Sequence, residues 1–330
     1  MDSSNVLISA KNLKKWYPIR KGLAFKPKGY VKAVDDVSFD LFSGETLGLV
    51  GESGCGKSTL ARTLLRLIEP TGGQLLCQGE DFLQADRRRL KAMRRNMQII
   101  FQDPFGSLHP KMRVSTILEE PLIIAKYGDK ATRRARVRAL MDMVGLKPEH
   151  LTRFPHEFSG GQRQRIVIAR ALATSPSFVI CDEPVSALDV SVRSQVLNLL
   201  KDLQNDMGLT YLFISHDLSV VEHFCDRVIV MYLGRIVEVA TRDDLFNNPA
   251  HPYTEALLSA APQVQEKNRR QRITLEGDIP SPANPPAGCR FHTRCPQARD
   301  ICKTEPPTVD LGQGHLVACH LRAGERSIEA

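Results

Sequence analysis

The chain has 330 residues, a length that suits two domains or one large domain with an appendage. Its composition, with 42% hydrophobic and 25% charged residues, is typical of a folded globular protein and excludes wholesale disorder, collagen and coiled coil. The formal net charge of +8 suits an anionic partner, which leaves nucleotides, nucleic acids and membrane surfaces open.

Membrane-spanning and secretory segments are not predicted. The longest apolar runs, such as residues 228–233, are far shorter than the roughly 18 residues that a membrane helix needs. Residues 1–13 lack a charged segment followed by an apolar one, so no signal peptide is expected. We therefore expect a cytoplasmic protein.

The first elements in chain order are two strands and a strand–loop–helix unit. Residues 6–13 and 31–41 alternate apolar and polar side chains, which predicts antiparallel strands. Residues 45–50 form a short apolar strand that enters a glycine-rich turn, and residues 58–68 have helical spacing. This order of elements is typical of α/β proteins.

Further short apolar runs alternate with helical stretches, which predicts a mostly parallel sheet covered on both faces. These strands are expected at residues 97–101, 178–181, 211–214 and 228–233. No strand is expected between 114 and 173, where residues 132–144 and 161–172 have helical spacing.

The expected fold class is therefore α/β, with a mostly parallel core sheet, an antiparallel N-terminal part and two further segments. We expect the core to comprise residues 1–110 and 174–248, with a helical insert at 111–173. A C-terminal extension at 249–330 would begin with a helix at 253–260, followed by a proline-rich linker and four cysteines.

A phosphate-binding loop is predicted at residues 51–58, Gly-Glu-Ser-Gly-Cys-Gly-Lys-Ser, because a strand precedes the pattern and a helix follows it. Its glycines let backbone N–H groups surround phosphates, Lys57 can reach the β- and γ-phosphates, and Ser58 can bind Mg²⁺. The alternative, a flexible glycine loop, does not account for this context. The candidate nucleotide-binding residues here are Gly51, Ser53, Gly54, Cys55, Gly56, Lys57, Ser58 and Thr59.

Two other stretches indicate nucleotide chemistry only in combination with this phosphate loop. Asp182 and Glu183 end an apolar strand, which would place Asp182 near Mg²⁺ and let Glu183 polarise a water molecule. The stretch Ser159, Gly160, Gly161 and Gln162 suits a helix start whose free N–H groups bind an anion. Each is by itself compatible with an ordinary structural role.

The order of these features resembles that of ATP-binding-cassette ATPases over residues 6–240. The chain has the phosphate loop, Gln102 after a strand, Ser159 to Gln162, the acid pair, Asp189 at the end of Ser-Ala-Leu-Asp, and His216 after another strand. The resemblance implies ATP as substrate and Mg²⁺ held with Ser58, Gln102 and Asp182.

Several residue roles follow from the resemblance alone. It implies that Tyr17 stacks on adenine, that Glu183 is the catalytic base, and that Gln102 and His216 contact the attacking water, with His216 also holding the γ-phosphate. It also implies a head-to-tail dimer in which Ser159 and Gly161 complete the nucleotide site that is built on the partner's phosphate loop. Tyr17 has the alternative of packing against the first strands.

Three C-terminal stretches make the resemblance more specific, to the ATP-binding subunits of dipeptide and oligopeptide importers in the peptide/nickel group. These stretches are residues 251–258, 277–282 and 288–296. That group implies a heterodimer with a second ATPase subunit, two membrane permeases and an extracytoplasmic solute-binding protein. The chain would then lie on the cytoplasmic face of the inner membrane as a peripheral subunit. The solute stays open among dipeptides, longer peptides, haem and nickel.

Four cysteines near the C-terminus form a separate candidate site. Cys289, Cys295, Cys302 and Cys319 are spaced more widely than the pairs typical of zinc ribbons. Four thiolates also suit a [4Fe–4S] cluster, which related importer subunits carry in this extension. The cluster is favoured, while zinc, with help from His292, His315 and His320, and free thiols stay as alternatives.

Three further expectations complete the sequence analysis. The basic residues between 87 and 95 are interpreted as a solvated helix face rather than a nucleic-acid site, because aromatic residues are not interleaved. The rival functions are a cassette acting on nucleic acid and a subunit of a phosphonate-degrading complex. Cys55, between a helix N-terminus and a lysine, is expected to be more reactive than a typical buried cysteine when no nucleotide is bound, with a small filler residue as the alternative.

Overall fold

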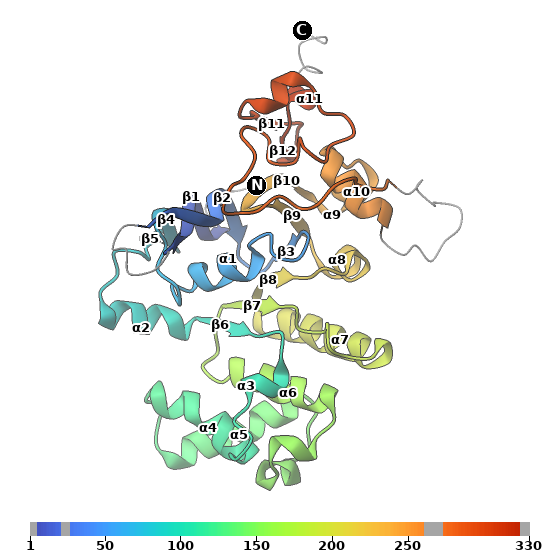
Figure 1. The fold of residues 1–330 in the computed structure, drawn as a ribbon. Helices are drawn as coiled ribbons and strands as arrows, with labels where there is room; N and C mark the ends of the chain where they lie inside the picture. The colour runs from blue at the N-terminus through green and yellow to red at the C-terminus, as the bar shows by residue number, and fades with distance from the viewer. Residues whose placement is uncertain (1–4, 21–26, 261–272, 324–330) are drawn as a thin grey trace. The chain divides into compact units, whose positions relative to one another are not determined.

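The structure is a computed structural model, and it describes residues 5–20, 27–260 and 273–323 (Figure 1). Two compact units make up the chain. The first unit comprises Met1–Phe42, Thr46–Leu83 and Ser215–Ala330, and the second comprises Ser43–Glu45 and Gln84–Ile214.

The first unit contains an antiparallel sheet of four strands in the order β2-β1-β4-β5. Its strands are β1 (Val6–Ile19), β2 (Gly29–Phe42), β4 (Gly72–Cys77) and β5 (Glu80–Asp81). Val37, Phe39 and Leu41 of β2 are buried while their neighbours are exposed, as expected for a strand with one covered face. The two antiparallel strands predicted near the N-terminus are confirmed, and both are longer than predicted.

The first unit also contributes five strands of the core sheet, in the order β11-β12-β10-β9-β3. Here β3 pairs in parallel with β9, whereas β10, β12 and β11 add antiparallel strands. The strands are β3 (Thr46–Val50), β9 (Arg227–Tyr232), β10 (Arg235–Thr241), β11 (Thr308–Asp310) and β12 (Leu316–Ala318). The helices of this unit are α1 (Lys57–Leu64), α8 (Leu218–Phe224), α9 (Arg242–Asn247), α10 (Pro252–Ala260), the 3₁₀ helix η5 (Asp300–Lys303) and α11 (His320–Ala323).

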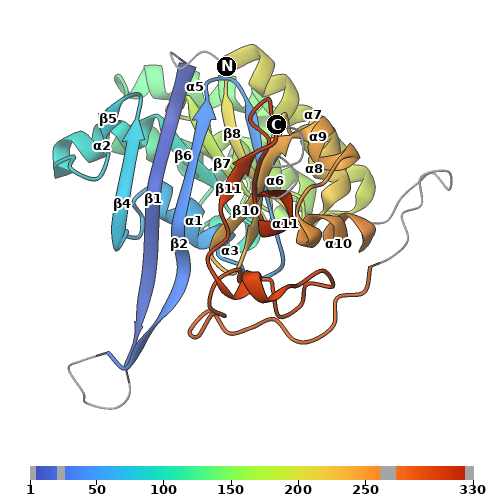
Figure 2. The same ribbon diagram turned by 90° about the horizontal axis from the view of Figure 1, so that it is seen from above.

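The C-terminal extension is part of this sheet, a feature that the sequence did not predict. In the sheet β12 lies between β10 and β11 (Figure 1), of which Figure 2 shows β10 and β11 from above, and the pairing joins Glu238 of β10 to Val317 of β12. Val317 is fully buried and packs with Ala250 and Cys319 in a small apolar cluster. The extension therefore shares hydrogen bonds and core contacts with the unit that contains the phosphate loop.

The second unit contains three parallel strands in the order β8-β7-β6. They are β6 (Met97–Ile100), β7 (Phe178–Asp182) and β8 (Thr210–Ile214), and every residue of β7 and β8 is buried. Continuous burial is expected for parallel strands that are covered on both faces.

The helices of the second unit include the group predicted from helical spacing. These are α2 (Arg87–Arg95), α3 (Pro104–Ser107), α4 (Val114–Ile124), α5 (Lys130–Met143), η2 (Pro148–Thr152), η3 (Pro155–Glu157), α6 (Gly160–Ala171) and α7 (Val190–Met207). Helices α4, α5 and α6 contact one another, and residues 114–173 contain no strand, as predicted (Figure 1). Within the part of the chain that the structure describes, no helix is long and apolar enough to cross a membrane.

Candidate functional site

The phosphate loop lies between β3 and α1. Two of its positions require glycine, because the backbone of other strands approaches them closely. Gly51 and Gly56 have φ values of 148° and 113°, which favour glycine. A Cβ atom on Gly51 would lie 2.1 Å from the Met231 carbonyl oxygen, and one on Gly56 would lie 2.1 Å from that of Ala33. The strand before the loop and the neighbouring strands therefore determine the loop's shape.

Lys57, the first residue of α1, folds back over this loop. Its Nζ donates to the carbonyl oxygens of Gly51, at 2.7 Å, and Glu52, at 3.0 Å, and its side chain is almost fully buried. The first turn of α1 contains no acidic residue that would oppose an anion. The lysine is thus held at the loop by neutral acceptors, which an incoming phosphate can replace.

Burial opposes the expected reactivity of the Cys55 thiol. The side chain is 4% exposed, and burial raises its pKa more than the neighbouring Lys57 lowers it. Desolvation disfavours the thiolate, so proximity to a lysine and a helix start is not enough to activate this cysteine.

The other candidates in the first unit are Tyr17 and His216. Tyr17 lies on β1, where Lys15 Nζ is 5.0 Å from the centre of its ring. His216 is exposed and directly follows Ser215, whose N–H donates to the Leu49 carbonyl on β3 at 3.3 Å. This contact places His216 near the end of the strand that leads into the phosphate loop.

In the second unit the candidate catalytic residues lie at adjacent strand ends. β6 and β7 pair in parallel, so Gln102 and Glu183 both follow the carboxyl ends of neighbouring strands. Gln102 Nε2 donates to Glu183 Oε2 at 2.9 Å. Asp182, the last residue of β7, is 4% exposed. Gln102 and Glu183, the two side chains that the sequence analysis assigned to water and Mg²⁺ chemistry, are thus in direct contact.

Glu183 has an unusual backbone conformation. Its φ is 50°, in the left-handed region that a residue with a side chain rarely adopts, at a cost of about 1–3 kcal/mol. The Glu183 N–H donates to the Ile214 carbonyl, and Ser186 donates to the Glu183 carbonyl, so β8 and the following turn hold Glu183 in place. Such strain is typical of residues whose direction matters for function.

The Ser159 to Gln162 stretch begins α6 as a capping box. Ser159 Oγ accepts from the Gln162 N–H at 3.4 Å, and Gln162 Oε1 accepts from the Ser159 N–H at 3.1 Å. A Cβ atom on Gly161 would lie 2.3 Å from Val192 of α7, whereas Gly160 has room. Asp189, which begins α7, makes no side-chain cap.

The four cysteines of the extension are gathered from separate turns. Burial raises the pKa of Cys289 to about 11, and the smaller effects of Cys319, Cys302 and Cys295 act in the same direction, so the four thiols interact electrostatically. None of these four cysteines forms a disulfide. Among residues 5–20, 27–260 and 273–323, no three His, Cys, Asp or Glu side chains are arranged to hold a single metal ion.

The three histidines that would assist a zinc site have other partners. His315 Nε2 lies 2.7 Å from Glu238 Oε1, His292 Nδ1 lies 2.7 Å from the Cys289 carbonyl, and His320 Nε2 lies 3.2 Å from the Thr304 carbonyl. Each of these contacts uses one ring nitrogen, and the four thiols are the donors whose type and number suit an iron–sulfur cluster.

The fold, an antiparallel N-terminal sheet with a mixed core sheet, is that of an ATP-binding cassette. Residues 34–186 match the ABC transporter family, and residues 237–302 match the oligopeptide/dipeptide transporter C-terminal region. A dimeric post-hydrolysis structure of the ATP-binding cassette MJ0796 with ADP and Pi has a TM-score of 0.62 and 29% identity, covering 71% of this chain and 98% of that one.

Two relatives match over nearly the whole chain. The dipeptide transport ATP-binding protein DppF of Escherichia coli (strain K12) is 57% identical over 314 residues, 95% of this chain and 93% of the relative. The oligopeptide transport ATP-binding protein AppF of Bacillus subtilis (strain 168) is 52% identical over 323 residues, 97% of this chain and 98% of the relative. The chain belongs to the family of ABC transporter ATP-binding proteins of the oligopeptide/dipeptide type.

Sequence reasoning missed the residues that support the phosphate loop from the C-terminal half. Arg294 pairs with Glu52, and the Tyr253 hydroxyl accepts from the Glu52 N–H. The sequence held no local signal for these contacts, because the partners are 242 and 201 positions apart.

Proposed function

We propose that this chain is the ATP-hydrolysing subunit that powers import of dipeptides or oligopeptides through a membrane permease. The observation that carries the hydrolytic role is the Gln102–Glu183 contact at the ends of β6 and β7, in a chain that also has a phosphate loop. The high identity to two peptide transport ATP-binding proteins supports the peptide cargo.

In this proposal each unit contributes its own set of groups. The loop N–H groups and Lys57 bind the phosphates of ATP, Tyr17 stacks on adenine, and His216 contacts the γ-phosphate. Glu183 accepts a proton from the attacking water, which Gln102 helps to orient. Mg²⁺, with Ser58, Gln102 and Asp182 as its oxygen donors, neutralises phosphate charge when bound.

The proposed assembly is a head-to-tail heterodimer with a second ATPase subunit. Residues Ser159 to Gln162 and Asp189 would face the ATP that is bound by the partner. The start of α6 supports this role, because its first turn carries no acidic residue and its N-terminal dipole favours an anion.

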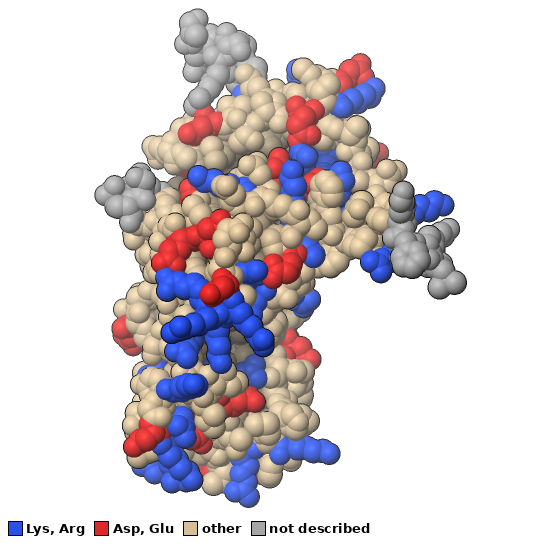
Figure 3. Space-filling model, turned by 90° about the vertical axis from the view of Figure 1, so that its left-hand side faces the viewer, with Lys and Arg blue, Asp and Glu red and all other residues tan. Residues whose placement is uncertain are grey.

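The proposed permease contact is a groove in the second unit, between α2, the end of α4 and the start of β6. This cavity has a volume of about 440 Å³ and combines the basic side chains of Arg87 and Lys91 with the apolar Leu90 and Ile124. Figure 3 shows Lys and Arg side chains concentrated on this face of the molecule. Such a surface suits an amphipathic acidic segment of a permease loop at the cytoplasmic side of the membrane.

For the four cysteines we propose a [4Fe–4S] cluster. Four cysteines that interact electrostatically supply the donor type and number of such a cluster, which supports the proposal. Protein purified without oxygen should contain about four iron atoms per chain and absorb broadly near 400 nm, roughly as such clusters do. Stoichiometric zinc without iron would contradict this assignment.

The peptide cargo is tested by reconstituting the chain with its permeases, partner ATPase and solute-binding protein in lipid vesicles. We expect ATP hydrolysis to be stimulated when the binding protein carries a di- or oligopeptide. Stimulation by nickel or haem alone would move the cargo to those solutes. Stimulation of the purified chain by nucleic acid, without permeases, would instead support a non-transport cassette.

A further inference from the structure

Glu52, the second residue of the phosphate loop, makes hydrogen bonds through its carboxylate, its N–H and its carbonyl. Its carboxylate accepts two hydrogen bonds from Arg294, from Nη1 to Oε2 at 2.8 Å and from Nη2 to Oε1 at 3.1 Å. Its N–H donates to the Tyr253 hydroxyl at 2.9 Å, and its carbonyl accepts from Lys57 Nζ at 3.0 Å. Both side chains that hold Glu52 from outside the loop come from the region after residue 249.

Arg294 is fixed before it reaches Glu52. Its side chain is 8% exposed, its N–H donates to the Phe291 carbonyl at 2.9 Å, and Nη1 lies 3.4 Å from the Tyr232 hydroxyl. Phe291 is 1% exposed and packs against the rings of Tyr232 and Tyr253, each with ring centres 5.3 Å apart. The guanidinium is thus presented to Glu52 by a rigid aromatic cluster.

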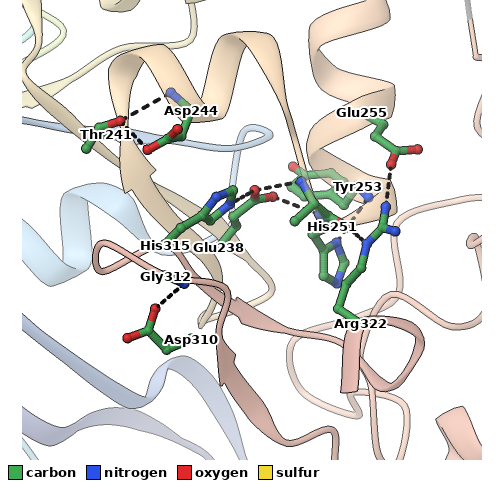
Figure 4. A network of polar contacts seen from close by, with 11 residues as sticks. Glu238, Thr241, Asp244, His251, Tyr253, Glu255, Asp310, Gly312, His315 and Arg322 are labelled. Carbon is green, nitrogen blue, oxygen red and sulfur yellow. Dashed lines mark hydrogen bonds and ion pairs between the residues drawn. The ribbon is translucent and has the colours of Figure 1, made fainter. Parts of the chain in front are cut away.

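Tyr253 is fixed by a buried polar network that Figure 4 shows. His315 of the extension lies against Glu238, and Glu238 accepts hydrogen bonds from the N–H groups of Ala250, at 2.8 Å, and His251, at 2.9 Å. The Tyr253 N–H then donates to His251 Nδ1 at 3.1 Å. The start of α10, which carries Tyr253, is therefore connected through Glu238 of β10 to His315 near β12.

A carboxylate beside a phosphate-binding loop has an electrostatic cost. An unpaired Glu52 would repel a triphosphate, and at a distance of several ångströms this repulsion is large enough to change affinity. A bidentate arginine cancels the charge and also fixes the carboxylate's direction. Lys57 cannot serve for this purpose, because the phosphates need its charge.

We propose that Arg294 is a positioning residue of the nucleotide site, which neutralises Glu52 so that the phosphate loop accepts ATP, while Tyr253 holds the loop backbone. The inference rests on the proposed binding of ATP at this loop. It assigns to the C-terminal extension a direct part in nucleotide affinity.

The test measures binding of MgADP and of a slowly hydrolysed ATP analogue to the full-length chain by calorimetry. Arg294→Gln should raise Kd about tenfold at low salt, in keeping with an uncompensated charge nearby. This defect relative to the unmodified chain should shrink in 0.5 M salt, because screening weakens charge repulsion. A defect of equal size at both salt concentrations would overturn the proposal.

A second variant separates charge from structure. Arg294→Gln combined with Glu52→Gln should bind the nucleotide within about threefold of the unmodified chain, since the repelling carboxylate is gone. Arg294→Lys should likewise keep most of the affinity, and it serves if Arg294→Gln does not fold. A double variant as weak as Arg294→Gln alone would show that the arginine is merely structural.

Two controls complete the experiment. Lys303 lies in the same extension, is exposed and pairs with Asp300, so Lys303→Gln should leave Kd unchanged. Lys57→Ala should abolish binding. If it does so while Arg294→Gln binds normally, only the present inference fails; if Lys57→Ala binds normally, the proposed nucleotide site fails as well.

Discussion

The phosphate loop and the start of α6 are both glycine-containing turns that open into a helix, but they are held in different ways. The phosphate loop takes its shape from distant residues, with Arg294 and Tyr253 on Glu52 and the Ala33 carbonyl against Gly56. The start of α6 is shaped by its own residues, Ser159 and Gln162, in a capping box. A site supported from afar should be sensitive to changes anywhere in its unit, whereas a locally supported site should tolerate them.

The strongest test of this difference exchanges one glycine in each turn for alanine. In Gly56→Ala the new Cβ would meet backbone at 2.1 Å with φ at 113°, so we expect nucleotide binding to fall by roughly 100-fold or more. In Gly160→Ala the nearest neighbour is a Leu188 methyl at 3.5 Å, so folding and binding to the isolated chain should persist. Calorimetry and thermal unfolding measure both; equal loss in the two variants would remove the contrast.

The proposed catalytic pair of the second unit, Gln102 and Glu183, lies outside the phosphate loop, and its removal should affect chemistry rather than binding. Glu183→Gln should lower steady-state ATP turnover in the assembled complex by about 10²-fold or more, because the general base is lost. Nucleotide affinity should stay within about threefold. Glu157→Gln, which alters only a hydrogen bond to the Phe154 N–H, is the matched control. Normal turnover in Glu183→Gln would refute the assignment.

The buried network of the first unit predicts a pH dependence. Burial lowers the pKa of His251 to about 4; Glu238 opposes this effect, and Arg322 makes a smaller contribution in the same direction as burial. The unfolded chain therefore binds one more proton between about pH 6.5 and 4, so stability falls as the pH decreases through this range, by up to about 3 kcal/mol.

The comparison variant for this effect is His251→Asn. Asparagine retains an acceptor for the Tyr253 N–H but does not titrate. Its unfolding free energy, measured in urea at pH 7 and pH 5, should fall less on acidification than that of the unmodified chain. Identical losses would show that His251 is not the titrating group.

The smallest effect is expected at the locally supported turn. Ser159→Ala removes one cap and should cost about 1 kcal/mol of unfolding free energy. Ser194→Ala, whose hydroxyl bonds only to the Val190 carbonyl, is the control and should cost less. A cost for Ser159→Ala above about 3 kcal/mol would mean that this turn also depends on distant structure.

The same distinction explains what the sequence could predict. The phosphate loop, the strand that ends at Asp182 and the helices of residues 130–171 carry local signals, namely glycine spacing, apolar runs and helical periodicity. By contrast, β4 begins with two glycines and β12 has three residues, so neither has a pattern of its own. These strands form because a partner strand supplies their hydrogen bonds.

The candidate site divides in the same way. Gln102 and Glu183 were predicted separately, and the parallel pairing of β6 and β7 brings them together. The burial of Cys55, which raises the pKa of its thiol, results from the packed strands around it, and the local sequence does not reveal it. Arg290, which donates to the Leu233 carbonyl and pairs with Asp35, likewise became visible only in three dimensions.

The ion pairs from the cysteine-rich segment to the nucleotide-binding half also bear on how such subunits diverge. Arg290 with Asp35 and Arg294 with Glu52 join positions more than two hundred residues apart. A recombination event that exchanged only the last third of the gene would separate each cation from its acid and leave buried charges unpaired. Inheritance of the two halves as one piece, with paired substitutions at these positions, is the evolutionary pattern that we expect.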